Sequence, residues 1–165
     1  MIDKHDANIE SNFGDRFDFY TRIGFLCVKL ENCISREFSA RLEPLNLTHR
    51  EAVLIWLCAK HKLSQNELCN MLNRGCVAID KNVIRLEIDK LEALKLLKRE
   101  QNPKNRRENI VKLTNKGKDI ANQTYDLMLK VHEDIILKYI SNEEYKHLHS
   151  LLHRIVKGIE SINGI

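Results

Sequence analysis

The chain of 165 residues contains little proline and glycine and no long hydrophobic run. Two prolines and six glycines leave no room for a long flexible linker, so one domain is expected over residues 1–165. The longest apolar run, "AVLIWLCA" at residues 52–59, is far shorter than the roughly 20 residues that span a bilayer. The N-terminus, "MIDKHDANIE", is charged where a signal peptide has an apolar core. We therefore expect no membrane partner.

Signatures of catalysis and of metal binding are also missing. The sequence has no Cys-His-Asp/Asn spacing, no G-x-S-x-G elbow and no glycine loop that could cradle a phosphate, so we expect neither an enzyme nor a cofactor. His149 and His153 are four residues apart, but no carboxylate or thiol completes a motif, so histidines at a solvated surface or an interface are expected rather than a metal site. The odd number of cysteines, without a CxxC pair, favours reduced thiols in a cytoplasm. They are Cys27, Cys33, Cys58, Cys69 and Cys76.

Positive charge is concentrated in one segment. Residues 79–118 hold twelve Lys and Arg against six Asp and Glu, which gives +6, whereas the whole chain carries +4 and the remainder therefore −2. A basic segment on a nearly neutral body is typical of a surface that binds a polyanion. A solvated, charge-rich face is the alternative interpretation of the same pattern.

Apolar spacing and capping motifs predict helices at both ends of the chain. Apolar residues recur at three- and four-residue steps over residues 15–42, which indicates a long amphipathic helix that Pro44 stops. Three S/T-x-x-E capping boxes predict further helix starts. They pair Thr48 with Glu51, Ser64 with Glu67, and Ser141 with Glu144. Another helix is expected from residue 80, and Thr114 should cap a long helix before the last one.

Two short strands are predicted between these helices. "LKLLKRE" and "NIVKLT" read as paired strands, with "QNPKN" as the turn and two arginines beside it. Short helices followed by a helix with an exposed polar face and then a hairpin describe a winged helix-turn-helix, in which one helix enters the major groove of DNA. The fold class is therefore mainly α with a small β-hairpin: a winged helix-turn-helix core flanked by long terminal helices.

Several stretches together resemble the MarR family of bacterial transcriptional regulators. They are "LNLTHREAVLIWL", "LSQNELC", "VIRLEIDKLEALKLLKRE" and "NPKNRRENIVKLTNKGKDI", within residues 45–120. The resemblance implies a cytoplasmic homodimer that binds a pseudo-palindromic operator in double-stranded DNA. It implies a repressor that responds to a small-molecule effector or a stress signal. Residues 12–45 and 118–163 would be the dimerisation helices, and residues 46–117 the DNA-binding lobe.

The resemblance also implies which residues contact DNA. In this family the β-hairpin is called the wing, and Arg107 takes the place of its arginine, with Arg106 beside it. Ser64 and Gln65 would contact phosphates. The remaining contacts would come from the helix that enters the major groove, called the recognition helix. They would lie at Lys81, Asn82, Val83, Arg85 and Leu86.

This sequence departs from the family pattern at several positions. Asn105 stands where the family usually has an aspartate beside the wing arginine, and Lys95 replaces a common glycine between the recognition helix and the wing. Cys27 follows the apolar spacing and is expected to pack in a core, whereas Cys33 and Cys76 are candidates for exposed thiols. The alternative function is a winged-helix module that docks another protein without sequence-specific DNA binding.

Overall fold

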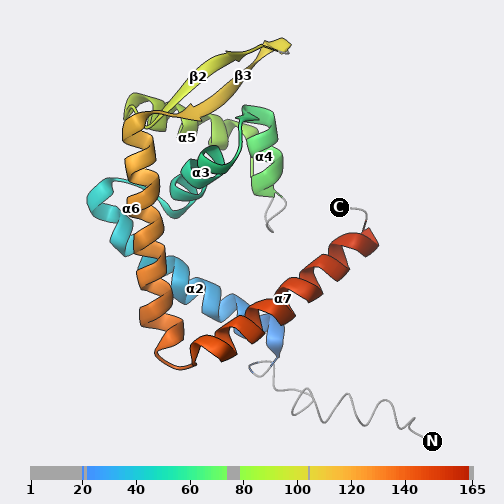
Figure 1. The fold of residues 1–165 in the computed structure, drawn as a ribbon. Helices are drawn as coiled ribbons and strands as arrows, with labels where there is room; N and C mark the ends of the chain where they lie inside the picture. Colours follow the sequence, from blue (N-terminus) through green and yellow to red (C-terminus); the bar gives the residue numbers. More distant parts are fainter. Residues whose placement is uncertain (1–19, 21, 74–78, 104, 164–165) are drawn as a thin grey trace, which may run out of the picture. The chain divides into compact units, whose positions relative to one another are not determined.

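The computed structural model describes residues 20, 22–73, 79–103 and 105–163, apart from the side chains of residues 106, 107, 162 and 163. The chain divides into two compact units. We call Phe38–Lys130 the hairpin unit, and the described residues before 38 together with those from Val131 onwards the terminal unit. In chain order the elements are α2 (Ile23–Leu42), the 3-10 turn η2 (Glu43–Leu45), α3 (His49–Lys60), β1 (Leu63–Ser64), α4 (Gln65–Asn73), α5 (Lys81–Ala93), β2 (Leu97–Asn102), β3 (Asn105–Leu113), α6 (Asn115–His132), the π-helix η3 (Glu133–Leu137) and α7 (Asn142–Asn163) (Figure 1).

The predicted capping boxes are all present. The Thr48 hydroxyl accepts from the Glu51 amide at 3.2 Å, and the Glu51 carboxylate accepts from the Thr48 amide at 2.8 Å. The same reciprocal bonds start α4 at Ser64 and α7 at Ser141. Each pair satisfies two amides that a helix N-terminus would otherwise leave without a partner. The predicted helix starts are therefore confirmed.

Apolar side chains from α2, α3, α4, α5 and the strands β2 and β3 form the core of the hairpin unit. The expected inward face of α5 is confirmed, since its three apolar residues are fully buried. Trp56 on α3 stacks on Phe38, with 5.6 Å between ring centroids, and its Nε1 donates to the buried Thr124 Oγ1 at 2.9 Å. The fully buried apolar side chains of this core are Phe38, Leu42, Leu54, Ile55, Leu68, Ile84, Ile88, Leu91, Leu97 and Val111.

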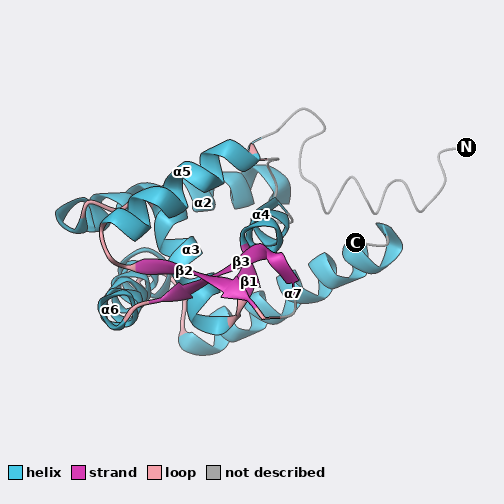
Figure 2. Cartoon of the chain, turned by 90° about the horizontal axis from the view of Figure 1, so that it is seen from above, coloured by secondary structure: helices cyan, strands magenta, loops and turns pink. Residues whose placement is uncertain are grey.

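The hairpin belongs to a three-stranded antiparallel sheet with the strand order β1-β3-β2 (Figure 2). Leu97 on β2 lies directly opposite Leu113 on β3, and the next opposed pair is Lys98 and Lys112. The two strands predicted from "LKLLKRE" and "NIVKLT" are present as β2 and β3, so the predicted hairpin is confirmed. The short strand β1 was not predicted, because two residues are too few to show an alternating pattern. Its pairing with β3 ties the start of α4 to the hairpin.

The turn from α5 into β2 is closed by a left-handed residue. Lys95 has φ 60°, its amide donates to the Glu92 carbonyl, and the next amide, of Leu96, donates to the Leu91 carbonyl. These are the two bonds of a Schellman motif, which glycine usually completes because it has no Cβ. The conformation explains why a glycine is common here in the family that the sequence resembles. Asn46 ends η2 in the same conformation, with φ 54°.

A close backbone approach fixes the start of α6 against this turn. A Cβ on Gly117 would lie 2.0 Å from the Leu96 carbonyl oxygen, so only glycine fits without a shift of the backbone. The Thr114 hydroxyl accepts from the Gly117 amide at 3.0 Å, as the predicted cap requires, and donates to the Lys95 carbonyl at 2.6 Å. The end of α5, the base of the hairpin and the start of α6 are thereby joined.

Many large apolar side chains of the terminal unit are exposed in the single chain. Val131 is buried, whereas the apolar stripes predicted for the first and last helices are largely uncovered. The exposed large apolar side chains of the terminal unit, inside and outside these stripes, are Tyr20, Ile23, Leu26, Val28, Leu30, Tyr139, Leu148, Ile155, Val156 and Ile159. Among the described residues, no helix is long and apolar enough to cross a membrane.

Candidate nucleic-acid interface

The outward face of α5 carries the residues that were predicted to read DNA. Asp80 caps this helix by accepting from the Asn82 amide at 2.6 Å, and the buried side of the helix contacts the core. All five predicted residues are exposed, including the apolar Leu86, which is 61% exposed. They are Lys81, Asn82, Val83, Arg85 and Leu86. The arrangement presents hydrogen-bond donors and an apolar patch from the first two turns of a rigid helix.

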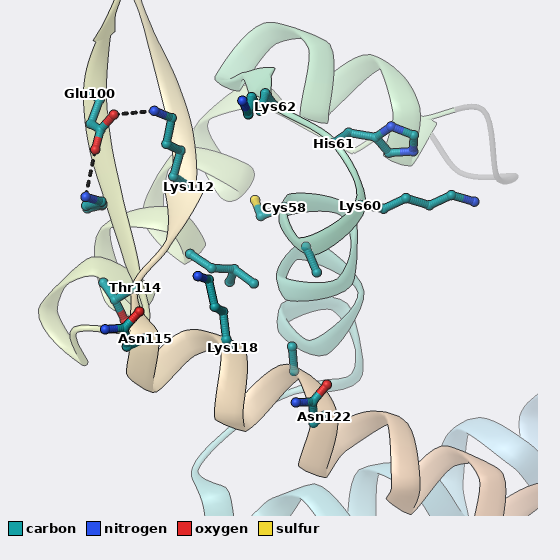
Figure 3. Close-up of a pocket in the computed structure, with 14 residues that line it drawn as sticks. Cys58, Lys60, His61, Lys62, Glu100, Lys112, Thr114, Asn115, Lys118 and Asn122 are labelled. Carbon is teal, nitrogen blue, oxygen red and sulfur yellow. Dashed lines mark hydrogen bonds and ion pairs between the residues drawn. The ribbon is translucent and has the colours of Figure 1, made fainter.

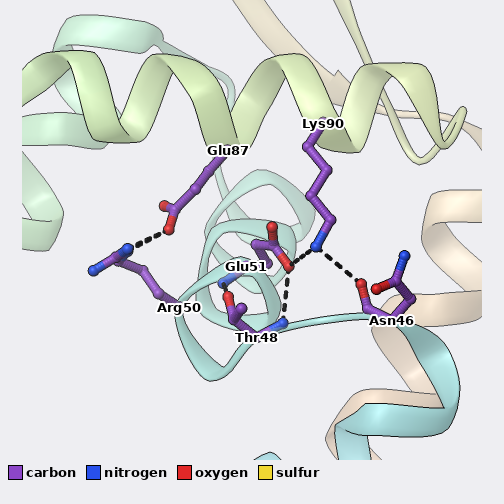
Figure 4. Close-up of polar contacts among 6 residues, drawn as sticks. All are labelled: Asn46, Thr48, Arg50, Glu51, Glu87 and Lys90. Carbon is purple, nitrogen blue, oxygen red and sulfur yellow. Dashed lines mark hydrogen bonds and ion pairs between the residues drawn. The ribbon is translucent and has the colours of Figure 1, made fainter.

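Two ion pairs connect α5 to the start of α3 (Figure 4). Both the Nε and the Nη2 of Arg50 lie 2.5 Å from Glu87 Oε1. Lys90 Nζ lies 2.9 Å from Glu51 Oε2 and donates to the Asn46 carbonyl at 3.0 Å. The hydrogen bond that Arg50 donates to Glu87 raises the pKa of the Arg50 guanidinium above its ordinary value. Because Glu51 is buried and belongs to the cap of α3, the second pair fixes α5 against a rigid helix end.

A third set of contacts connects α5 to the hairpin. The guanidinium group of Arg99 on β2 lies 2.6 Å from Asp89 Oδ1 and 2.5 Å from Glu92 Oε2. It also donates to Gln65 Oε1 of α4 at 3.4 Å. One arginine therefore joins α4, α5 and β2. Such fixed support is what a surface needs to hold contact groups in position.

Sequence reasoning did not identify these supporting residues. Glu87 and Lys90 lie beside the buried stripe of α5, where a charged side chain is expected to find a partner. That spacing indicates a partner but cannot identify Arg50, which is 37 residues away along the chain. The partner of Arg99 on α4, Gln65, is 34 residues away, and no local motif predicts that contact.

Ser64 and Gln65 lie at the start of α4. Ser64 is 3% exposed, and its hydroxyl accepts from the Glu67 amide at 3.3 Å. The Ser64 amide donates to the Glu67 carboxylate at 2.7 Å, and this bond, followed by that of the Ser64 side chain, lowers the pKa of the Glu67 carboxyl. Gln65 is partly exposed and receives the Arg99 bond. Their contact with phosphate stays a prediction.

Arg106 and Arg107 lie in the β3 strand, close to the turn of the hairpin. Asn105 begins this strand and is exposed. The side chains of the two arginines lie outside the described residues, so their predicted contacts with DNA stay predictions. Lys104 also lies outside the described residues.

The cysteines differ in part from expectation. Cys27 is exposed, so its predicted packing is wrong in the single chain, because the apolar stripe of the first half of α2 is uncovered there. Cys33 is partly exposed, Cys58 and Cys69 are buried, and all four are free thiols. Cys76 lies outside the described residues.

The histidines of α7 form a stack of rings. His149 and His153 have ring centroids 6.1 Å apart, and Tyr145 lies next to His149. Both histidines are exposed. Across the described ranges, no group of three or more His, Cys, Asp or Glu is placed to hold a metal ion.

Solved structures share this fold. A mutant MarR from E. coli in complex with operator DNA is 23% identical, with a TM-score of 0.69 over 86% of this chain and 99% of that chain. A MarR-family transcriptional regulator from Rhodococcus sp. RHA1 is 18% identical, with a TM-score of 0.74 over 85% and 96%. The transcriptional repressor CouR, bound to a 23-mer DNA duplex, is 22% identical, with a TM-score of 0.72 over 86% and 97%.

No protein-family model matches the chain, and no curated protein matches it. The likeness to the solved structures is thus one of fold: the chain has the winged-helix fold of the MarR family.

Proposed function

We propose that this chain, built on the MarR-family fold, is a sequence-specific DNA-binding regulator of transcription. The observation that carries the proposal is the exposed face of α5, with Lys81, Asn82 and Arg85, held by ion pairs to α3 and β2. Lysine, asparagine and arginine are the side chains that pair with base edges and phosphates in the major groove. We assign the DNA-binding lobe to residues 46–117.

The protein acts as a homodimer on a pseudo-palindromic operator. The exposed apolar stripes of α2 and α7 support this part of the proposal, because continuous apolar faces of this size usually mark an interface. Residues 12–45 and 118–163 are the dimerisation region. Two recognition helices in one dimer would read half-sites about 34–36 Å apart, which is one turn of DNA.

The hairpin, which is the wing of this fold, adds a second kind of contact with DNA. The hairpin extends from the same sheet that supports α5, and Arg106 and Arg107 are near its tip. Planar guanidinium groups can enter an A·T-rich minor groove, where the electrostatic potential is most negative.

We propose a repressor that is released by a small ligand or a stress signal.

Binding to DNA can be tested on fragments selected from the protein's own genome. Wild-type protein should bind a selected operator more tightly than scrambled DNA. With about 6 to 10 phosphate contacts per dimer, affinity should fall by roughly 10³ to 10⁵ between about 50 and 200 mM salt. Weak binding without salt dependence would instead support a protein-docking module.

Two arginine variants separate the recognition helix from the wing. Arg85→Ala should cost about 1–3 kcal/mol at one base position and relax specificity there. Arg107→Ala should weaken binding to all sequences and reduce the preference for A·T-rich flanks. Arg154→Ala, at an exposed position of α7, is the control and should change neither. Thermal melting should be normal for all three. Operator binding by Arg85→Ala with wild-type affinity and specificity would refute the role of α5.

A further inference from the structure

A cavity of about 860 Å³ lies within the hairpin unit, apart from the proposed DNA contacts (Figure 3). Its walls are the end of α3 with the two residues after it, the strands β2 and β3, and the start of α6. Among the described residues, none of α4 or α5 lines it. Small-molecule sites in proteins commonly measure about 300–1,000 Å³, so the cavity has a suitable size for a metabolite.

The alternation of side chains along β2 places the cavity on the other face of the sheet from α5. Arg99 contacts Asp89 and Glu92 of α5. Its neighbours Lys98 and Glu100 line the cavity. Successive side chains of a strand point to opposite faces of a sheet. A ligand in the cavity would therefore lie behind the hairpin as seen from the recognition helix.

Lysine dominates the cavity wall. Five lysines line it, against the single carboxylate of Glu100, which is already bonded to two of them, Lys98 and Lys112. Within the described ranges, Lys60, Lys62 and Lys118 have no ion pair or hydrogen bond through their ammonium groups. In Figure 3, Lys60 extends away from the other wall residues, whereas Lys118 extends into the space between the hairpin and α3. Lys62 and Lys118 thus leave uncompensated positive charge at the cavity.

The rest of the wall combines apolar surface with amide groups. Leu113 and Ala121 supply apolar atoms, and Asn115 and Asn122 supply amides that can donate hydrogen bonds. Cys58 is 8% exposed, and burial raises the pKa of its thiol to about 12. At neutral pH this thiol is uncharged, so it adds apolar surface and no repulsion of an anion.

We propose that this cavity binds a small organic phosphate ester carrying at least two negative charges. Its phosphate groups contact Lys62 and Lys118, and its apolar part lies against Leu113 and Ala121. Two uncompensated ammonium groups on different elements require more than one negative charge for neutralisation, and lysine is a common phosphate ligand. The apolar wall distinguishes such a ligand from inorganic phosphate.

The test is a calorimetric titration of the full chain, without DNA, with adenosine, AMP, ADP and inorganic pyrophosphate. Ionic strength is held near about 0.15 M, where the Debye length is about 8 Å and unspecific attraction is screened. ADP should bind saturably and more tightly than AMP, and AMP more tightly than adenosine. ADP should also bind more tightly than pyrophosphate, because only ADP carries a base whose ring face can pack against Leu113 and Ala121.

The double variant Lys62→Gln with Lys118→Gln should weaken ADP binding at least about tenfold, the loss expected for charge-assisted hydrogen bonds. Both side chains are exposed, so the variant should melt normally. The matched control is Lys146→Gln with Lys157→Gln, which removes the same charge from exposed positions of α7 outside the cavity. The control should bind ADP like the wild type.

Three results would overturn the proposal: no saturable ADP binding, pyrophosphate binding as tight as that of ADP, or an equal loss of affinity in both double variants. If ADP does not bind and the Lys62/Lys118 variant loses affinity for duplex DNA, these lysines contact DNA instead. Because the ligand titration contains no DNA, its outcome does not depend on whether the proposed regulator function is right.

Discussion

At the scale of single residues, Lys95 adopts a backbone conformation that its own side chain disfavours. Its φ of 60° lies in the left-handed region, where a residue with a Cβ loses roughly 1–2 kcal/mol relative to the right-handed one. The two Schellman bonds around it, together with the burial of Leu91 and Leu96, keep the turn in place nevertheless. The close approach of Gly117 to the Leu96 carbonyl shows how little this turn could move.

Replacing this lysine with glycine should therefore stabilise the protein. We expect Lys95→Gly to raise the free energy of unfolding by about 0.5–1 kcal/mol, since relief of strain exceeds the added chain entropy of the unfolded state. Denaturant unfolding measures the change. As a control, Lys146→Gly in the second turn of α7 should cost about 1 kcal/mol, because there glycine replaces a helix former. A loss of stability in Lys95→Gly would contradict the strain argument.

At the scale of elements, the hairpin places two positively charged side chains next to each other and offsets their repulsion with one carboxylate. Lys98 and Lys112 are directly opposite each other on neighbouring strands, an arrangement that is unfavourable by itself. Glu100 accepts from both lysines. Hydrogen bonds from Lys112 and then Lys98 lower the pKa of Glu100 to about 2. The charges of these two lysines are thus offset while this carboxylate is ionised.

This arrangement gives the hairpin a defined response to acid. Because the folded pKa is lowered, the contribution of Glu100 is fully present above the ordinary glutamate pKa of about 4.3 and is lost as pH falls towards about 2. At about pH 4, NMR of the side-chain carboxyl should show Glu100 still ionised, whereas an ordinary glutamate is near half protonation. In Lys112→Met the pKa should return towards its ordinary value. An unchanged pKa in that variant would show that Lys112 is not the cause.

Local signals account for the elements that could be predicted from sequence. Thr48, Ser64, Ser141 and Thr114 each carry a cap whose partners lie within a few residues, so a pattern of four letters suffices. The expected long helix from Thr114 onwards was less accurate. The structure ends α6 at His132 and continues as a short π-helix, because a change of hydrogen-bond register leaves little trace in apolar spacing.

The supports of the candidate site could not be predicted in this way. The exposure of Lys81 and Arg85 follows from the period of α5, and it is confirmed. The partners Arg50 and Glu87 come from different helices, and their pairing depends on how those helices pack. The cavity beside Lys62 and Lys118 likewise arises from segments that only the folded chain brings together.

At the scale of the whole molecule, the uncovered apolar stripes call for a partner. We expect a dimer whose dissociation cannot be separated from unfolding, so the melting temperature should rise with protein concentration. Ile155 on the α7 stripe is 51% exposed in the single chain. In a monomer, Ile155→Glu would change stability by at most about 0.5 kcal/mol. In the dimer it should prevent assembly and lower the melting temperature.

Sedimentation at micromolar concentration measures the assembly directly. Lys157→Glu, on the polar side of the same helix, is the matched control and should sediment as the wild type does. A folded wild-type monomer, or an Ile155→Glu variant that still dimerises, would exclude this interface.

The contact between Trp56 and Thr124 gives the molecule a built-in optical signal. Trp56 is the only tryptophan of the chain, its Nε1 donates to a fully buried hydroxyl, and its ring stacks on Phe38. Indole emission depends on how polar and how mobile its surroundings are. Selectively excited tryptophan emission therefore reports on the hairpin unit alone, without a label. Comparing it with circular dichroism, to which all helices contribute, would show whether the hairpin unit and the terminal unit unfold together or in sequence.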